Sequence, residues 1–143
     1  MTESIRILLV DDQVLVRRGF GMVLEAEDDL EVVGEAGDGQ EAIEVARAHR
    51  PDVVLMDVRM PGMDGIRATE ILTAMLPESR VIILTTFDLD EYAFGGLQAG
   101  ASGFLLKDAR PAELVDAIRA VHRGDAVVAP RVTARLVELA APA

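Results

Sequence analysis

The chain has 143 residues, half of them hydrophobic, and carries a net charge of −11 with no Cys. This composition is that of one globular domain, excludes disulfides and thiolate metal sites, and disfavours binding of nucleic acid by this chain alone. No apolar run is long enough to span a membrane, and the charges of Glu3 and Arg6 argue against a signal peptide. We therefore expect a cytoplasmic domain.

Short apolar, β-branched runs alternate with helical patterns along the chain. They predict strands over 5–10, 30–35, 52–57, 80–85 and 103–106, and helices over 14–24, 39–49, 65–76, 89–99 and 111–123. Asp38 and Asp64 fit as helix N-caps, Pro111 as a first helical residue, and Gly100 and Gly124 as residues just past helix ends. The alternation predicts an α/β fold, a doubly wound parallel sheet with helices on both faces.

The last part of the chain, residues 125–143, has a different pattern. A short apolar stretch precedes Pro130, which opens a further helix with one apolar face, formed by Val132, Leu136 and Leu139. The charges of this part cancel, so the whole negative charge lies in residues 1–124. We predict a domain over 1–124, followed by a linker segment that contains the start of an extra helix.

Polar residues stand at the carboxyl ends of the predicted strands, where ligands bind in open parallel sheets. They are Asp11, Asp12, Asp57, Thr85 and Lys107. A single Asp at such a position is often a turn residue. Three carboxylates that meet at one edge repel one another unless a cation neutralises them, and an all-oxygen site suits Mg²⁺.

Asp57 follows the apolar run 53–56, so its carboxylate is expected to emerge at the sheet edge. A carboxylate beside Mg²⁺ and an ammonium can attack phosphorus, because the cations absorb the charge of the transferring phosphoryl group. Lys107 is the only Lys among 14 basic residues, and Thr85 is placed to donate a hydrogen bond to a phosphoryl oxygen. The alternatives are a solvated charge for Lys107 and an ordinary β-branched strand residue for Thr85.

A dinucleotide-binding pattern, G-x-G-x-x-[GA], is matched by residues 37–42. The match follows the second predicted strand rather than the first, and Asp38 and Glu41 place negative charge where a pyrophosphate would sit. We interpret the segment as a turn with an Asp cap.

With Asp11-Asp12, the segment LMDVRMPGMDG at 55–65, Thr85 and Lys107, residues 5–123 resemble response-regulator receiver domains. Residues 85–88 and 100–108 are most similar to the NarL/FixJ (LuxR-type) subfamily. The resemblance implies a flavodoxin-like (CheY-like) five-stranded sheet of order 2-1-3-4-5. Members of the subfamily carry a C-terminal helix-turn-helix domain, which we do not find in these residues, so DNA binding is expected only in a longer parent chain.

The resemblance also implies the roles of the site residues. Asp57 would accept the phosphoryl group, and Mg²⁺ would be held by Asp12 and Asp57, by Asp11 through water, and by the main-chain carbonyl of Arg59. Thr85, Phe104 and Lys107 would be the switch hydroxyl, the switch aromatic residue and the phosphoryl-binding Lys, with Phe104 rotating inward on phosphorylation. The implied partners are a sensor histidine kinase or a small donor such as acetyl phosphate, and a second copy of the domain after phosphorylation, with no membrane.

Two positions depart from the family pattern. Asp108 follows Lys107, where many receivers have Pro, so the isomer of that peptide bond is left open. Gly95 and Gly96 lie within the predicted helix 89–99 and together cost about 2 kcal/mol of helix stability relative to Ala. They predict either a soft helix that takes part in switching or close packing of the helix on the sheet.

Two other functions compete with this interpretation. Haloacid-dehalogenase-type phosphohydrolases also use an Asp nucleophile with Mg²⁺, but their turnover needs a second Asp two residues later, where this chain has Arg59. A degenerate receiver that works without phosphorylation is unsupported, because every expected site residue is present. The sequence therefore predicts a signalling domain rather than an enzyme.

Overall fold

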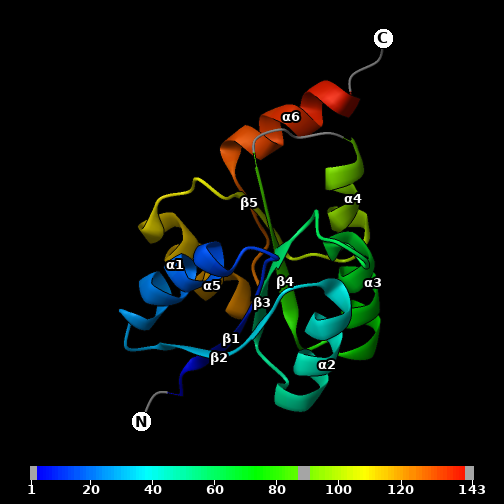
Figure 1. Cartoon of the computed structure of the whole chain (residues 1–143). Helices are drawn as coiled ribbons and strands as arrows, with labels where there is room; N and C mark the ends of the chain where they lie inside the picture. Colours follow the sequence, from blue (N-terminus) through cyan, green and yellow to red (C-terminus); the bar gives the residue numbers. More distant parts are fainter. Residues whose placement is uncertain (1–2, 87–90, 141–143) are drawn as a thin grey trace.

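The structure, a computed structural model, describes residues 3–86 and 91–140 (Figure 1). The strands are β1 (Ile5–Val10), β2 (Leu30–Ala36), β3 (Val53–Asp57), β4 (Arg80–Thr85), β5 (Gly103–Leu106) and β6 (Val127–Val128). The helices are α1 (Val14–Glu25), α2 (Gly39–His49), α3 (Gly65–Met75), α4 (Glu91–Gln98), α5 (Pro111–His122) and α6 (Pro130–Ala140). None of the helices in these two ranges has both the length and the apolar character needed to cross a membrane.

The strands form one parallel sheet of order β2-β1-β3-β4-β5-β6. The doubly wound α/β fold and the order of the first five strands are therefore confirmed. The sixth strand is an addition to the five-stranded sheet that the resemblance implies. Val127 donates its N–H to Ser102 at 3.1 Å and Ala129 to Phe104 at 3.0 Å, so this segment extends the sheet beyond β5. A two-residue strand is too short to show any periodicity in the sequence.

Helices cover both faces of the sheet. In Figure 1, α1 and α5 lie on one side, and α2, α3 and α4 lie on the other. Each face has its own apolar cluster, and alternate residues of a strand enter different clusters: Ile83 and Phe104 belong to one, and Ile82 and Leu105 to the other. Because both faces are buried, the central strands are continuous apolar runs, as the sequence suggested.

The predicted helix limits agree with the capping contacts. Asp38 accepts a hydrogen bond from the Glu41 N–H at 2.8 Å, which confirms the turn and cap at residues 37–42. Asp64 caps α3 in the same way through the N–H of Arg67. Gly100 has φ of +107°, a value that favours glycine. The predicted helix 89–99 is observed as α4, and residues 89 and 90 of that prediction lie outside the described residues.

The two glycines of α4 have different surroundings. A β-carbon on Gly96 would lie 2.9 Å from Cγ1 of Ile83, which is too close without a shift of that side chain. A β-carbon on Gly95 would lie 3.7 Å from the nearest atom of Ile66, an ordinary contact. The packing explanation therefore holds for Gly96, which lets α4 approach β4, and not for Gly95.

The helix predicted from residue 130 onward packs on the domain. Val132 is completely buried in the same apolar cluster as Phe104, and the partly buried Leu136 and Leu139 lie against that cluster. Arg131 also forms an ion pair with Asp108 at 3.3 Å. Residues 127–140 are thus built onto the sheet through β6 and α6 rather than extending away from it.

Candidate functional site

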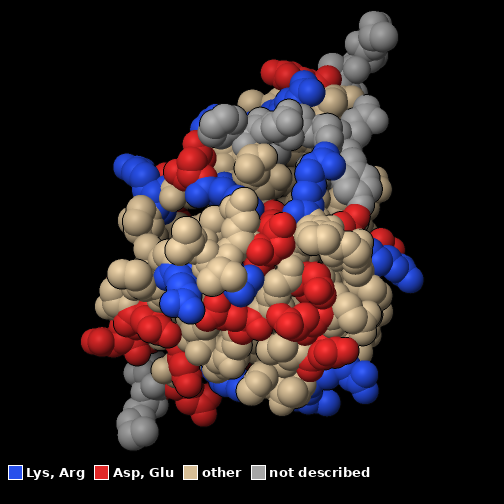
Figure 2. Space-filling model, viewed as in Figure 1, with Lys and Arg blue, Asp and Glu red and all other residues tan. Residues whose placement is uncertain are grey.

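Three carboxylates meet at the carboxyl edge of the sheet. Asp11 and Asp12 follow β1, and Asp57 is the last residue of the neighbouring strand β3. Each residue offers one oxygen atom, and these atoms all lie within 4.8 Å of one another. Asp11 and Asp57 are buried and Asp12 is exposed, so the group opens to solvent at one side. On the molecular face drawn in Figure 2, acidic side chains gather across the middle.

Lys107 follows β5 and reaches two of these carboxylates. Its Nζ lies 2.8 Å from Oδ2 of Asp11 and 3.1 Å from Oδ1 of Asp57. Burial opposes the charge of Lys107, but the hydrogen bond to Asp11 and the charge of Asp57 outweigh burial and raise the pKa of this ammonium. Lys107 is therefore a charged part of the site and not a solvated surface cation.

Asp57 has a raised pKa. Its burial raises its pKa to about 6, the nearby charges of Asp11 and Asp12 act in the same direction, and Lys107 only partly offsets them. Three carboxylates against one ammonium leave an excess of negative charge at this edge. A further cation placed among the carboxylates would lower that repulsion.

The loop after Asp57 is held tightly against the end of β3. Gly62 has φ of +73°, and Gly65 donates its N–H to the carbonyl of Val58 at 2.8 Å. A β-carbon on Gly65 would lie 1.8 Å from the carbonyl oxygen of Asp57, so only glycine fits there. These two glycines fold the chain from Asp57 back into α3 and fix the Asp57 main chain at the sheet edge.

The remaining predicted residues lie around this group. Thr85 is buried at the end of β4, and its carbonyl accepts the N–H of Lys107 at 2.7 Å. Arg59 is exposed in the loop after Asp57. The described residues contain no cis peptide bond, so the bond between Lys107 and Asp108 is trans.

Phe104 already lies inside the domain. Its side chain is completely buried and contacts Phe94, with the ring centroids 5.4 Å apart. The rotation of Phe104 on phosphorylation stays a prediction, and it would start from this buried position. A change at Phe104 would have to be a repacking against α4 and β4.

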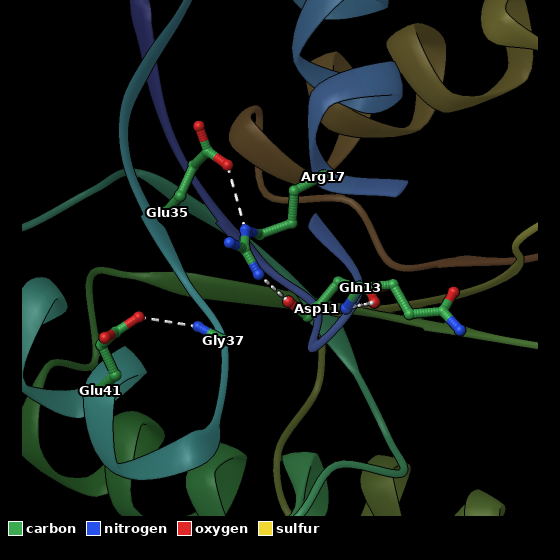
Figure 3. A network of polar contacts seen from close by, with 6 residues as sticks. All are labelled: Asp11, Gln13, Arg17, Glu35, Gly37 and Glu41. Carbon is green, nitrogen blue, oxygen red and sulfur yellow. Dashed lines mark hydrogen bonds and ion pairs between the residues drawn. The ribbon is translucent and has the colours of Figure 1, made fainter. Parts of the chain in front are cut away.

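Two residues at this edge were missed by the sequence analysis. The N–H of Gln13 donates to Oδ1 of Asp11 at 2.9 Å, and Arg17 donates from Nη1 to the main-chain carbonyl of Asp11 (Figure 3). Backbone contacts of this kind leave no side-chain signal. Arg17 lies in a helix, where an Arg is normally taken for a solvated residue.

The chain matches a known protein family over most of its length. The family described as the response regulator receiver domain matches residues 7–119. The uncharacterized transcriptional regulatory protein YxjL of Bacillus subtilis strain 168 is 50% identical over 135 residues, which are 94% of this chain and 62% of that protein. The chain thus spans about 60% of the length of the curated relatives it matches.

Solved structures agree in fold. A two-component response regulator of the LuxR family from Aurantimonas sp. SI85-9A1 superposes with a TM-score of 0.88 at 36% identity, over 96% of this chain and 98% of that one. The signal receiver domain of NarL from Mycobacterium tuberculosis gives 0.81 at 39% identity, over 85% of this chain and 98% of that one. The chain belongs to the response regulator receiver domain family and is of the NarL/LuxR type.

Proposed function

We propose that this receiver domain accepts a phosphoryl group on Asp57 in the presence of Mg²⁺ and changes conformation to control an output. One observation carries the proposal. The buried carboxylate of Asp57 lies in an ion pair with Lys107, at the edge where Asp11 and Asp12 bring their oxygens within 4.8 Å. This arrangement supplies a nucleophilic oxygen, an ammonium and a cation site in one place.

The residues present fit Mg²⁺. The donor set is all oxygen, two of its carboxylates are buried, and the exposed Asp12 leaves room for water, which this ion usually retains. Asp11, Asp12, Asp57 and the main-chain carbonyl of Arg59 would hold it. The ion would supply positive charge next to the oxygens of the transferring group.

The protein groups have distinct tasks in the transfer. A carboxylate oxygen of Asp57 attacks the phosphorus of an acyl phosphate or phosphohistidine, and the bond from phosphorus to the departing acetate or imidazole breaks. Lys107, already 3.1 Å from Asp57, lies next to the charge that develops on the phosphoryl oxygens. Thr85, at the end of β4, would donate a hydrogen bond to one of these oxygens.

A signalling role fits better than hydrolytic turnover. In haloacid-dehalogenase-type phosphohydrolases, hydrolysis needs a residue two positions after the nucleophile that acts as acid and base. This chain has Arg59 at that position. Without such a group, the acyl phosphate on Asp57 would persist and be lost slowly. We propose Thr85, Lys107 and Phe104 as the residues through which its presence reaches α4 and β5.

The partners follow from the family. We propose a sensor histidine kinase as the phosphoryl donor and a homodimer of the phosphorylated domain. The relative YxjL is a transcriptional regulatory protein. We therefore propose that residues 1–124 form the phosphoacceptor domain and that residues 125–143, whose β6 and α6 pack on it, connect it in the parent protein to a DNA-binding domain.

The test is an intact-mass measurement after incubation with acetyl phosphate and Mg²⁺. The chain should gain the mass of one phosphoryl group, while Asp57→Asn and addition of EDTA should each prevent the gain. Thr86→Ala, which changes an exposed residue at the same edge, is the matched control and should still gain it. An unchanged adduct in Asp57→Asn would refute Asp57 as the acceptor.

A further inference from the structure

Arg17 connects the acidic edge of the sheet to two other elements. It lies in the first turns of α1, donates from Nη1 to the main-chain carbonyl of Asp11, and donates from Nε to Oε1 of Glu35 on β2 at 3.1 Å. Figure 3 shows the guanidinium between these two acceptors. The Arg17 side chain is only 15% exposed, against 46% for Glu35. Arg17 is thus a largely buried cation with two defined contacts.

Each polar group of Asp11 takes part in a hydrogen bond. Its N–H donates to the carbonyl of Ala36 at 3.1 Å, and its two carboxylate oxygens accept from Gln13 and Lys107. Its carbonyl lies beyond the last paired residues of β1 and β3, Val10 and Met56. Arg17 supplies the hydrogen bond for this carbonyl where the strand ladder no longer does.

We infer that Arg17 is a positioning residue for the acidic cluster. Its guanidinium fixes the main chain at Asp11, and Glu35 fixes the guanidinium. The direction in which Asp11 and Asp12 present their carboxylates then depends on the Arg17 contact. The inference deepens the proposed function, on which it rests, by assigning the placement of two metal-binding carboxylates to a residue that touches neither carboxylate.

The geometry calls for Arg rather than for a cation in general. A guanidinium is a planar fork that can donate to two acceptors in fixed directions, whereas an ammonium is a compact charge on a flexible stem. Lys at position 17 would keep the charge but lose one of the two contacts. A positioning role and a purely electrostatic role therefore predict different results for the same substitutions.

The two roles predict opposite changes in the affinity for Mg²⁺ when Arg17 is removed. If Arg17 acted only by its charge, removing that charge would favour binding of another cation at the acidic edge. If Arg17 acts by position, removing it weakens the site, because residues that hold metal ligands in place typically contribute about 10- to 100-fold in metal affinity. The affinity for Mg²⁺ thus separates them.

The experiment compares Arg17→Lys, Arg17→Gln and Glu35→Gln with the wild-type chain, by calorimetric titration with Mg²⁺. Arg18→Gln is the matched control, since it removes the same charge from an exposed position on the same helix. We expect Kd for Mg²⁺ to rise about tenfold in both Arg17 variants, to rise less in Glu35→Gln, and to stay unchanged in Arg18→Gln. Wild-type affinity in Arg17→Lys, or tighter binding in Arg17→Gln, would overturn the inference.

A second readout needs no metal. Hydrogen exchange in metal-free protein should be faster at the Gln13 amide in both Arg17 variants and in Glu35→Gln, because that amide is bonded to Asp11. Unchanged exchange there would also overturn the inference. If the wild type bound no Mg²⁺ and accepted no phosphoryl group, the proposed function would fail, while the exchange result would still decide whether Arg17 positions Asp11.

Discussion

Nζ of Lys107 lies 3.1 Å from Oδ1 of Asp57, although the two residues come from strands that are not neighbours. Asp57 ends β3, Lys107 follows β5, and β4 runs between them. The Lys107 side chain therefore crosses the end of β4, where Thr85 is buried. A change at Asp57 can thus reach β4 and β5 through one side chain.

Lys107→Arg should separate ion binding from switching. The guanidinium keeps the positive charge, so titration with Mg²⁺ should be unaltered, but the larger group cannot take the place of a compact ammonium between Asp11 and Asp57. We expect hydrogen exchange over residues 80–106 to respond to phosphorylation in the wild type and much less in the variant. A normal response in Lys107→Arg would show that no compact ammonium is required.

Asp57→Asn should stabilise the metal-free protein at neutral pH. A carboxyl with a raised pKa stabilises the folded state below its unfolded-state pKa, and that contribution is lost as the pH rises through the folded-state pKa. For Asp57 the window runs from 3.8 to about 6. The variant should therefore be more stable at pH 7.5 by about 3 kcal/mol at most, with little difference at pH 4.

Urea unfolding in EDTA at both pH values measures this difference. Asp12→Asn is a suitable comparison, because Asp12 is exposed and belongs to the same group. Equal stability of Asp57→Asn and wild type at pH 7.5 would contradict the burial cost assigned to Asp57.

Single substitutions of Gly95 and Gly96 by Ala should change the stability of the protein in opposite directions. Gly95→Ala should raise stability by up to about 1 kcal/mol, because Ala favours the helix and there is room for its methyl group. Gly96→Ala should lower stability, because its methyl group would meet Ile83 at 2.9 Å. Thermal unfolding of the two single variants measures both effects, and stabilisation by Gly96→Ala would contradict the packing role.

Val132→Ala tests whether α6 belongs to the packed domain. The side chain is fully buried, so its truncation should cost about 2 kcal/mol of unfolding free energy. Val137, on the same helix, is 65% exposed, and Val137→Ala should have almost no effect on unfolding. Equal stabilities of the two variants in a urea titration would show that α6 does not contribute to the core.

The sequence analysis predicted helices and strands wherever the spacing of apolar residues formed a pattern of sufficient length. The limits of β1 and β4 are confirmed at both ends, since each contains a run of four apolar residues that ends at a polar residue of the sheet edge. The two-residue strand β6 could not be predicted, because it forms through hydrogen bonds that β5 offers to a short segment. The site residues were predicted from their strand ends, since carboxyl ends of parallel strands meet at one edge.

The remaining details depend on distances between elements. The separate roles of Gly95 and Gly96 follow from Ile66 and Ile83, which lie far from them in the sequence. The contact of Arg17 is with a main-chain carbonyl, which exists at every residue and so gives no pattern. The inner position of Phe104 likewise depends on how α4 lies on the sheet.

The most direct test of phosphorylation at Asp57 is to locate the acyl phosphate. Borohydride reduces an aspartyl phosphate to homoserine, which peptide mass spectrometry identifies by residue. After acetyl phosphate and Mg²⁺, we predict homoserine at position 57, none at positions 11 and 12, and none anywhere when EDTA is present. Homoserine at Asp11 or Asp12, or no homoserine under any condition that supports Mg²⁺ binding, would contradict the assignment of Asp57 as the phosphoacceptor.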